Sequence, residues 1–155
     1  MIVANKKMKA YIDRGSVVNL DELKEISFAK LGKGYFFEKE INVNVQVVSD
    51  TYAVDSNFDW AGFEYSTNKI HLEDLIQAEI PDVVVAGIGL AKRLANQFKI
   101  QFPSQNAVFW VGCDDFGEYP SVTLSFYVKR DGMLPLLPED ESSLETFENA
   151  ILIVY

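Results

Sequence analysis

The sequence predicts one α+β domain, in which helices cover one face of a mostly antiparallel sheet as a single pair of layers. Residues 41–47 alternate apolar and polar side chains, the pattern of a strand with one face in water. Residues 82–98 place apolar side chains at helical spacing, and two β-rich runs, at 107–111 and 121–128, flank an acidic segment. Because helices and strands do not alternate regularly along the chain, a βαβ fold is not expected.

The length and composition fit a single globular domain over residues 1–155. A chain of this length buries about 70% of the surface that it exposes when unfolded, and 48% of its residues are apolar. The sequence contains no apolar run of bilayer length, and its first nine residues lack the charge order of a signal peptide. Cys113 has no second cysteine to pair with, which is typical of a reducing compartment. We therefore expect a cytoplasmic protein without a membrane partner.

The first half of the chain is predicted to form one helix and three strands. Asn19 is a suitable N-cap and acidic residues follow it, so a helix is expected over Asn19–Ile26. The alternation over 41–47 predicts the first strand. Two further segments, Thr51–Val54 and Phe58–Tyr65, are expected to pair as a hairpin across the polar residues between them.

The second half is predicted to hold the main helix and the clearest strands. Residues 70–79 suit a short helix, and residues 82–98 a longer one with its apolar stripe against the sheet. The runs Ala107–Val111 and Ser121–Val128 are expected to pair across an acidic loop. The final stretch, Leu144–Val154, fits a helix, and its last residues equally fit a closing strand.

The charge of the chain is strongly acidic and unevenly distributed. The net charge is −9, with eight Lys or Arg against five Asp or Glu in residues 1–39 and six against eighteen in residues 40–155. Because proteins bind nucleic-acid phosphates with Lys and Arg, no nucleic-acid partner is expected. An acidic field attracts a basic protein and speeds the encounter. A basic protein is therefore the expected partner; in the simpler alternative, the acidity only keeps the protein in solution.

One segment mimics a nucleotide-binding turn. Val83–Lys92 contains Gly87 and Gly89 after an apolar run, like the strand and loop that bind dinucleotides. However, Lys92 occupies the position where that fingerprint has a small residue, and the acidic residue that would hold a ribose is missing. We expect these residues to lie in a helix, and we predict no cofactor.

Side chains that commonly carry catalysis or bind metals are few. His71 is the only histidine, and the two acidic residues shortly after it do not complete a zinc site. The three carboxylates of the acidic loop lack the spacing of a calcium-binding loop. Cys113 precedes two of these carboxylates, which disfavour its thiolate. We expect neither a metal site nor an enzyme.

Carboxylates and aromatic rings are interleaved in two segments, one before residue 66 and one after residue 113. Large rings with a few charges are typical of interface hot spots, and carboxylates can imitate the phosphates that a nuclease binds. If both segments lie at one end of the sheet, they form one partner-binding surface. Its predicted residues are Asp55, Asp59, Trp60, Glu64, Asp114, Asp115, Glu118 and Tyr119.

In general character, a small acidic α+β domain without a catalytic motif is similar to the bacterial immunity proteins that neutralise a toxin domain. The resemblance carries no residue over. It implies a non-catalytic inhibitor that masks a basic, nuclease-type toxin domain, and we expect a monomer or a weak homodimer. Two alternatives stay open. One is an interaction domain that self-associates or binds a peptide, and the other is a small enzyme or ligand-binder with a carboxylate-lined pocket.

Overall fold

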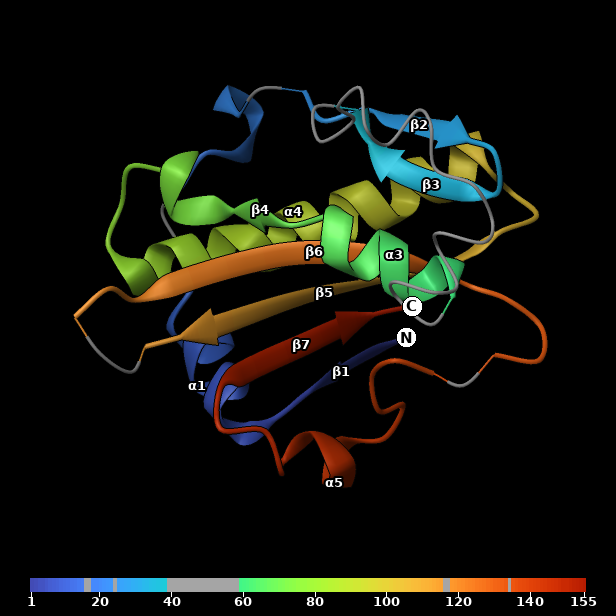
Figure 1. Ribbon diagram of the computed structural model, residues 1–155. Coiled ribbons are helices and arrows are strands. Elements are labelled where there is room, and N and C mark those ends of the chain that lie inside the picture. Colours follow the sequence, from blue (N-terminus) through green and yellow to red (C-terminus); the bar gives the residue numbers. More distant parts are fainter. Residues whose placement is uncertain (16–17, 24, 39–58, 116–117, 134) are drawn as a thin grey trace.

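A five-stranded sheet forms the centre of the computed structural model, which describes residues 1–15, 18–23, 25–38, 59–115, 118–133 and 135–155. All neighbouring strands of this sheet are antiparallel, in the order β1–β7–β5–β6–β4 (Figure 1). The strands are β1 (Ile2–Ala4), β4 (Ile70–His71), β5 (Asn106–Asp114), β6 (Ser121–Lys129) and β7 (Ala150–Val154). A second sheet pairs β2 (Phe28–Leu31) with β3 (Gly34–Phe37). The predicted α+β class with a mostly antiparallel sheet is confirmed.

The long helix α4 (Ile80–Gln101) covers one face of the central sheet, as the apolar stripe over 82–98 predicted. Proline in its first turn and Lys99 in its last suit the two ends of a helix. Gly87 and Gly89 lie inside this helix and form no phosphate-binding turn. A Cβ atom on Gly87 would lie 2.5 Å from Leu72 Cδ1, so this glycine lets a neighbouring segment approach the helix closely.

A second helix, α1 (Lys6–Arg14), packs against α4 and β7. Its N-cap, Asn5, is only 1% exposed, and Asn5 Oδ1 accepts hydrogen bonds from the backbone N–H groups of Met8 (3.0 Å) and Ile151 (3.2 Å). Asn5 Nδ2 donates to the carbonyl oxygen of Asn149 at 2.8 Å. One buried amide therefore joins the start of α1 to the start of β7.

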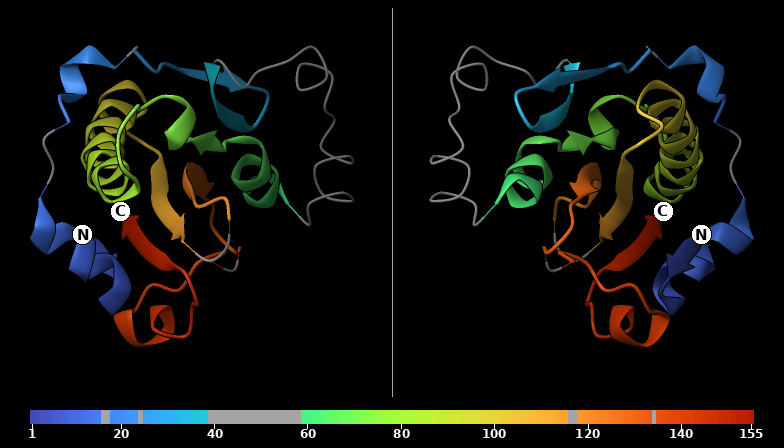
Figure 2. Two further views of the ribbon diagram at one scale, coloured as in Figure 1. Left: turned by 90° about the vertical axis from the view of Figure 1, so that its left-hand side faces the viewer. Right: turned by 90° about the vertical axis from the view of Figure 1, so that its right-hand side faces the viewer.

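The opposite face of the sheet is covered as well, whereas the prediction placed helices on one face only. The helix α3 (Trp60–Thr67) and the chain between β6 and β7, including α5 (Glu141–Leu144), lie there. Tyr65 of α3 stacks on Trp110 of β5 with 5.3 Å between ring centroids. Figure 2 shows α4 and α3 on opposite sides of the sheet.

One predicted strand is a helix. Phe58–Tyr65 was expected to form half of a hairpin, but residues 60–67 form α3. The reason is local, because Asp59 is an N-cap whose Oδ1 accepts a hydrogen bond from the N–H of Gly62 at 2.7 Å. The proposed partner strand Thr51–Val54 and the strand predicted over 41–47 lie outside the described residues.

Two other segments differ in detail from their predictions. Asn19 caps a single 3₁₀ turn, η1 (Leu20–Glu22), in place of a helix extending to Ile26. The predicted helix over 70–79 is β4 followed by a 3₁₀ turn, η4 (Leu72–Asp74). At the C-terminal end the closing-strand alternative is confirmed, since β7 follows the short α5. In the part of the chain that the structure describes, no helix has both the length and the apolar character needed to cross a bilayer.

Candidate functional site

The predicted partner residues do not form one surface. Asp114 pairs with Ser121 at the start of β6, whereas Glu64 accepts a hydrogen bond from the N–H of Val128 near its end. Seven strand residues span about 23 Å, so the two predicted groups lie near opposite ends of β6 (Figure 1). Asp55, which belongs to the same predicted group as Glu64, lies outside the described residues.

Glu64 is completely buried and belongs to the interior of the protein. Its Oε1 accepts hydrogen bonds from the N–H of Tyr35 (2.8 Å) and from Arg130 Nη2 (2.6 Å). Its Oε2 accepts from the N–H of Val128 (2.8 Å) and from Arg130 Nη1 (3.0 Å). Burial raises the pKa of Glu64, and the hydrogen bonds and charge of Arg130 oppose that shift. This carboxylate is not available to a partner.

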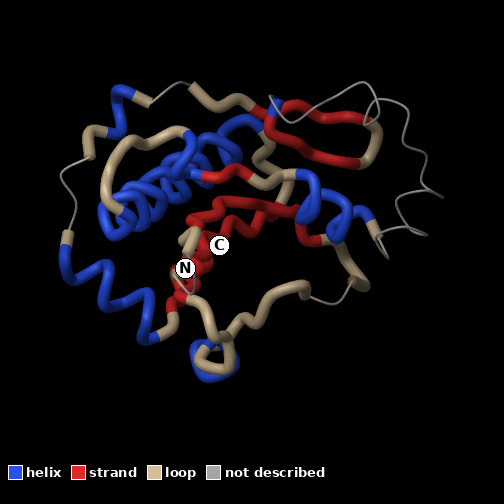
Figure 3. The backbone as a smooth tube through the Cα atoms, turned by 60° about the vertical axis from the view of Figure 1, so that its left-hand side comes forward, coloured by secondary structure: helices blue, strands red, loops and turns tan. Residues whose placement is uncertain are grey.

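Four residues later, Asn68 makes a similar set of contacts and is also fully buried. Its Oδ1 accepts from the N–H of Phe37 (2.9 Å), and its Nδ2 donates to the carbonyl oxygens of Tyr35 (2.9 Å) and Phe126 (3.3 Å). Glu64 and Asn68 therefore bridge the backbone of β3 and that of β6. Figure 3 shows α3 beside both the two-stranded sheet and the end of the five-stranded sheet.

The other two described residues of the first group are also structural. Trp60 is 7% exposed and packs in a small cluster with Phe36 and Phe63. Asp59 is the N-cap of α3. The aromatic and acidic side chains of this segment thus build the contact between the two sheets.

The second group lies on the surface. Asp114, Asp115 and Glu118 are exposed, and Tyr119 is 88% exposed. The turn η4 comes to the same end of the sheet, because His71 pairs with Thr123 of β6. We define the acidic end as this exposed set together with the two carboxylates of η4. Its residues are Glu73, Asp74, Asp114, Asp115, Glu118 and Tyr119.

The two carboxylates of η4 were not predicted to belong to a partner surface. Glu73 Oε2 accepts a hydrogen bond from the N–H of Val122 at 2.9 Å, which holds η4 against the start of β6. Asp74 is exposed beside it. Neither residues 70–82 nor residues 113–119 contain a Lys or Arg. The acidic end therefore concentrates negative charge from two segments that are distant in sequence.

The other titratable side chains described at the acidic end are Cys113, Tyr11 and His71. Cys113 is fully buried, and burial raises the pKa of its thiol to about 11, so the thiol stays protonated at neutral pH. Tyr11 donates from its hydroxyl to Asp115 Oδ2 at 3.1 Å. His71 is half exposed, with Nδ1 3.5 Å from Glu73 Oε1. Among the described residues, no three His, Cys, Asp or Glu side chains gather closely enough to hold a metal ion.

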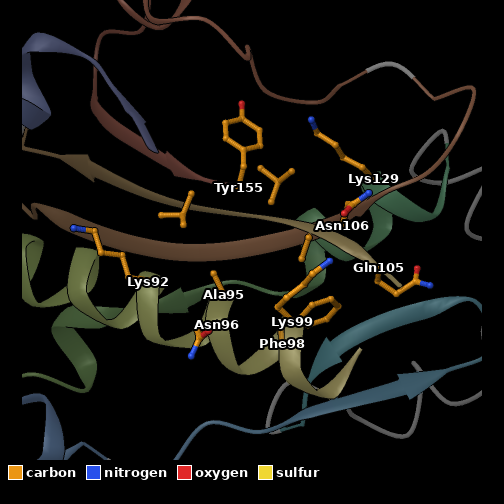
Figure 4. Close-up of a pocket in the computed structure, with 12 residues that line it drawn as sticks. Lys92, Ala95, Asn96, Phe98, Lys99, Gln105, Asn106, Lys129 and Tyr155 are labelled. Atoms are coloured by element: carbon orange, nitrogen blue, oxygen red, sulfur yellow. The ribbon is translucent and has the colours of Figure 1, made fainter. Parts of the chain in front are cut away.

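A pocket of the opposite charge lies elsewhere in the protein. It has a volume of about 610 Å³ and lies between the second half of α4 and the ends of β5 and β7 (Figure 4). Three lysines and no carboxylate are found among the described residues that line it. The pocket therefore gives no support to a carboxylate-lined ligand or active site.

Comparison with known proteins places the chain in a family. A family model described as the uncharacterized protein PM0498 family matches residues 3–155. No curated protein and no solved structure matches the chain significantly.

Proposed function

Because the chain belongs to the uncharacterized protein PM0498 family, we propose a function from its own surface: a non-catalytic protein whose acidic end covers a basic patch on another protein. The specific form that we propose is an immunity-like inhibitor, which neutralises a basic, nuclease-type toxin domain by masking its surface. We also propose a cytoplasmic location, on the basis of the single unpaired cysteine, Cys113.

The observation that carries the proposal is the exposure of Tyr119 among carboxylates. Its side chain is 88% exposed, although tyrosine has a large apolar ring that proteins commonly cover at interfaces. Interface hot spots are enriched in such rings, surrounded by residues that exclude water. Five carboxylates lie at the same end of the sheet as this ring, three from the segment of Tyr119 and two from η4. A basic partner can therefore cover the ring while its cations meet the acids.

The carboxylates contribute mainly to the recognition of the partner and to the rate of association. Separate carboxylates on a surface can occupy the places where a nuclease would bind successive phosphates, and so block that site. Opposite fields accelerate association, and charges more than about 8 Å apart are screened at physiological ionic strength. Binding through the acidic end is therefore expected to be fast and sensitive to salt.

Two other functions are weaker candidates. Self-association is tested directly by the solution mass of the protein. A small enzyme with a carboxylate-lined pocket lacks support from the pocket of about 610 Å³, since lysines line it.

The test uses a charge-reversed acidic end. The variant Asp115→Lys with Glu118→Lys is compared with the parent for binding to the product of the adjacent open reading frame, measured by surface plasmon resonance at low and physiological salt. We expect association slowed at least tenfold at low salt, because the steering charge is reversed. A second variant, Tyr119→Ala, is expected to speed dissociation.

The matched control is Asp131→Lys with Glu38→Lys, the same charge change on two exposed carboxylates outside the acidic end. This control should slow association far less. Equal slowing in both double variants would mean that net charge alone matters, and unchanged binding in the acidic-end variant would reject this surface. Circular dichroism confirms folding in each case.

A further inference from the structure

Tyr11 reaches the acidic end from α1, a helix that supplies none of the carboxylates of that surface. It lies in the second half of α1 and is partly buried against the main core. Its hydroxyl donates to Asp115 Oδ2 at 3.1 Å and lies 3.9 Å from Cys113 Sγ. Because Tyr11 and Asp115 are 104 positions apart in sequence, only the packing of α1 on β7 and α4 brings this pair together.

The Tyr11 hydroxyl is a fixed hydrogen-bond donor. Burial raises the pKa of this hydroxyl above its ordinary value, and the neighbouring Cys113 and Asp115 add to the shift, so it stays protonated at neutral pH. The Cys113 thiol donates to the Tyr11 hydroxyl oxygen from the buried side. The hydrogen of the Tyr11 hydroxyl is therefore directed to the Asp115 carboxylate.

Asp115 needs such a contact because of its place in the chain. The ladder between β5 and β6 ends with the pair Asp114 and Ser121, so Asp115 lies one residue beyond it. Its side chain is exposed and carries its charge toward solvent. A hydrogen bond to a charged acceptor is stronger than one between neutral groups. The bond from Tyr11 thus restrains this carboxylate after the strand has ended.

A second carboxylate of the acidic end is held in a comparable way. Glu73 Oε2 accepts from the N–H of Val122 in β6. Asp115 is held from α1 and Glu73 from β6, so two carboxylates from distant segments have fixed places before a partner arrives. A surface ordered in advance loses less conformational freedom when it binds.

We propose that Tyr11 is a positioning residue of the acidic end, which holds the Asp115 carboxylate where a cation of the partner meets it. This inference rests on the proposed function. It also specifies the partner as a folded surface with cations at fixed places, because a flexible basic chain adjusts to a carboxylate in any position. Tyr11 carries no charge, so its hydroxyl affects the lifetime of the complex, whereas the acidic field sets the association rate.

The test uses Tyr11→Phe, which keeps the ring and the net charge and removes only the hydroxyl. Binding to the product of the adjacent open reading frame is measured by surface plasmon resonance. We expect dissociation at least fivefold faster and an association rate within twofold of the parent. The matched control is Tyr155→Phe, which removes a hydroxyl that donates to the carbonyl oxygen of Pro138 at 3.1 Å, outside the acidic end. Equal dissociation rates in the two variants, or slower association in Tyr11→Phe, would overturn the proposal.

A flexible basic probe tests the class of partner. Fluorescein-labelled octalysine is titrated with the parent and with Tyr11→Phe, and fluorescence anisotropy reports the affinity. Because both proteins carry the same charge, we expect the two affinities to agree within twofold. If octalysine binding weakens as much as binding of the folded product, the acidic end does not select a folded surface.

A measurement without any partner separates this inference from the proposed function. Nitrogen-15 relaxation gives the order parameter of the Asp115 amide in the free protein. Tyr11→Phe should lower this order parameter, and Tyr155→Phe should leave it unchanged. A hydroxyl with a merely structural role would lower stability to urea and leave Asp115 as ordered as in the parent, which would reject positioning by Tyr11. If the parent binds no product of the adjacent frame, the proposed function fails, and the relaxation result still decides whether Tyr11 positions Asp115.

Discussion

Glu64 gives the clearest case of a residue whose sequence context misleads. It lies in Phe-Glu-Tyr, a carboxylate between two rings, which suits a surface patch. In the structure both of its oxygens accept hydrogen bonds from backbone N–H groups and from Arg130. Arg130 lies 66 positions away in sequence, so no local pattern indicates the pair. Buried carboxylates need such a partner, because an isolated charge in the interior costs several kcal/mol.

We expect Glu64→Gln to destabilise the fold by about 3 kcal/mol or more. Glutamine keeps the shape but replaces one acceptor oxygen with an NH₂ group, which would face N–H donors and leave the Arg130 charge uncompensated. Glu139→Gln is the matched control, because it removes the exposed pair with Lys129 and should cost less than about 1 kcal/mol. Urea unfolding followed by circular dichroism measures both. Similar losses in the two variants would contradict a structural role for the buried pair.

Among the elements that the structure describes, those with an uninterrupted pattern were predicted correctly. The stripe over 82–98, with Pro81 before it, predicted α4, and the β-rich runs predicted β5 and β6. The segment Phe58–Tyr65 alternates apolar and polar side chains only in part, and its N-cap Asp59 decided in favour of a helix. The short elements β4 and η4 depend on pairing with β6, which residues 70–79 alone do not encode.

The packing of α4 gives a direct test at this scale. Ile88 is 4% exposed and belongs to the main core. Ile88→Asp should lower the free energy of unfolding by about 4 kcal/mol, because it places an unpaired charge among apolar side chains. Asn96→Asp, on the exposed side of the same helix, should change it by less than about 0.5 kcal/mol. Thermal unfolding by calorimetry compares the two. If Ile88→Asp has the same melting temperature as the parent, α4 does not bury the face that carries Ile88.

At the scale of the whole molecule, the sequence predicted one part of the acidic end and did not predict the part that η4 contributes. The loop at residues 114–119 was found from its composition, because exposed acids and an aromatic ring stand together in sequence. The contribution of Glu73 and Asp74 needed the antiparallel pairing of β4 with the start of β6. The lysine-lined pocket takes its cations from α4 and β6, so only the fold brings them together. Surfaces assembled from distant segments require topology, and composition does not supply it.

The position of β7 has a consequence for how this protein is made. β7 follows every other described strand along the chain, yet it lies between β1 and β5 and pairs with both. While the ribosome is still adding residues 150–154, β1 therefore has no neighbour and β5 has an open side. The helix α4 with β5 and β6 can associate earlier, because their contacts are close in sequence. A chain stopped after residue 149 should lose the cooperative urea transition and bind hydrophobic dyes such as ANS. If the shortened chain unfolds as cooperatively as the full chain, the stability of the sheet does not depend on the synthesis of β7.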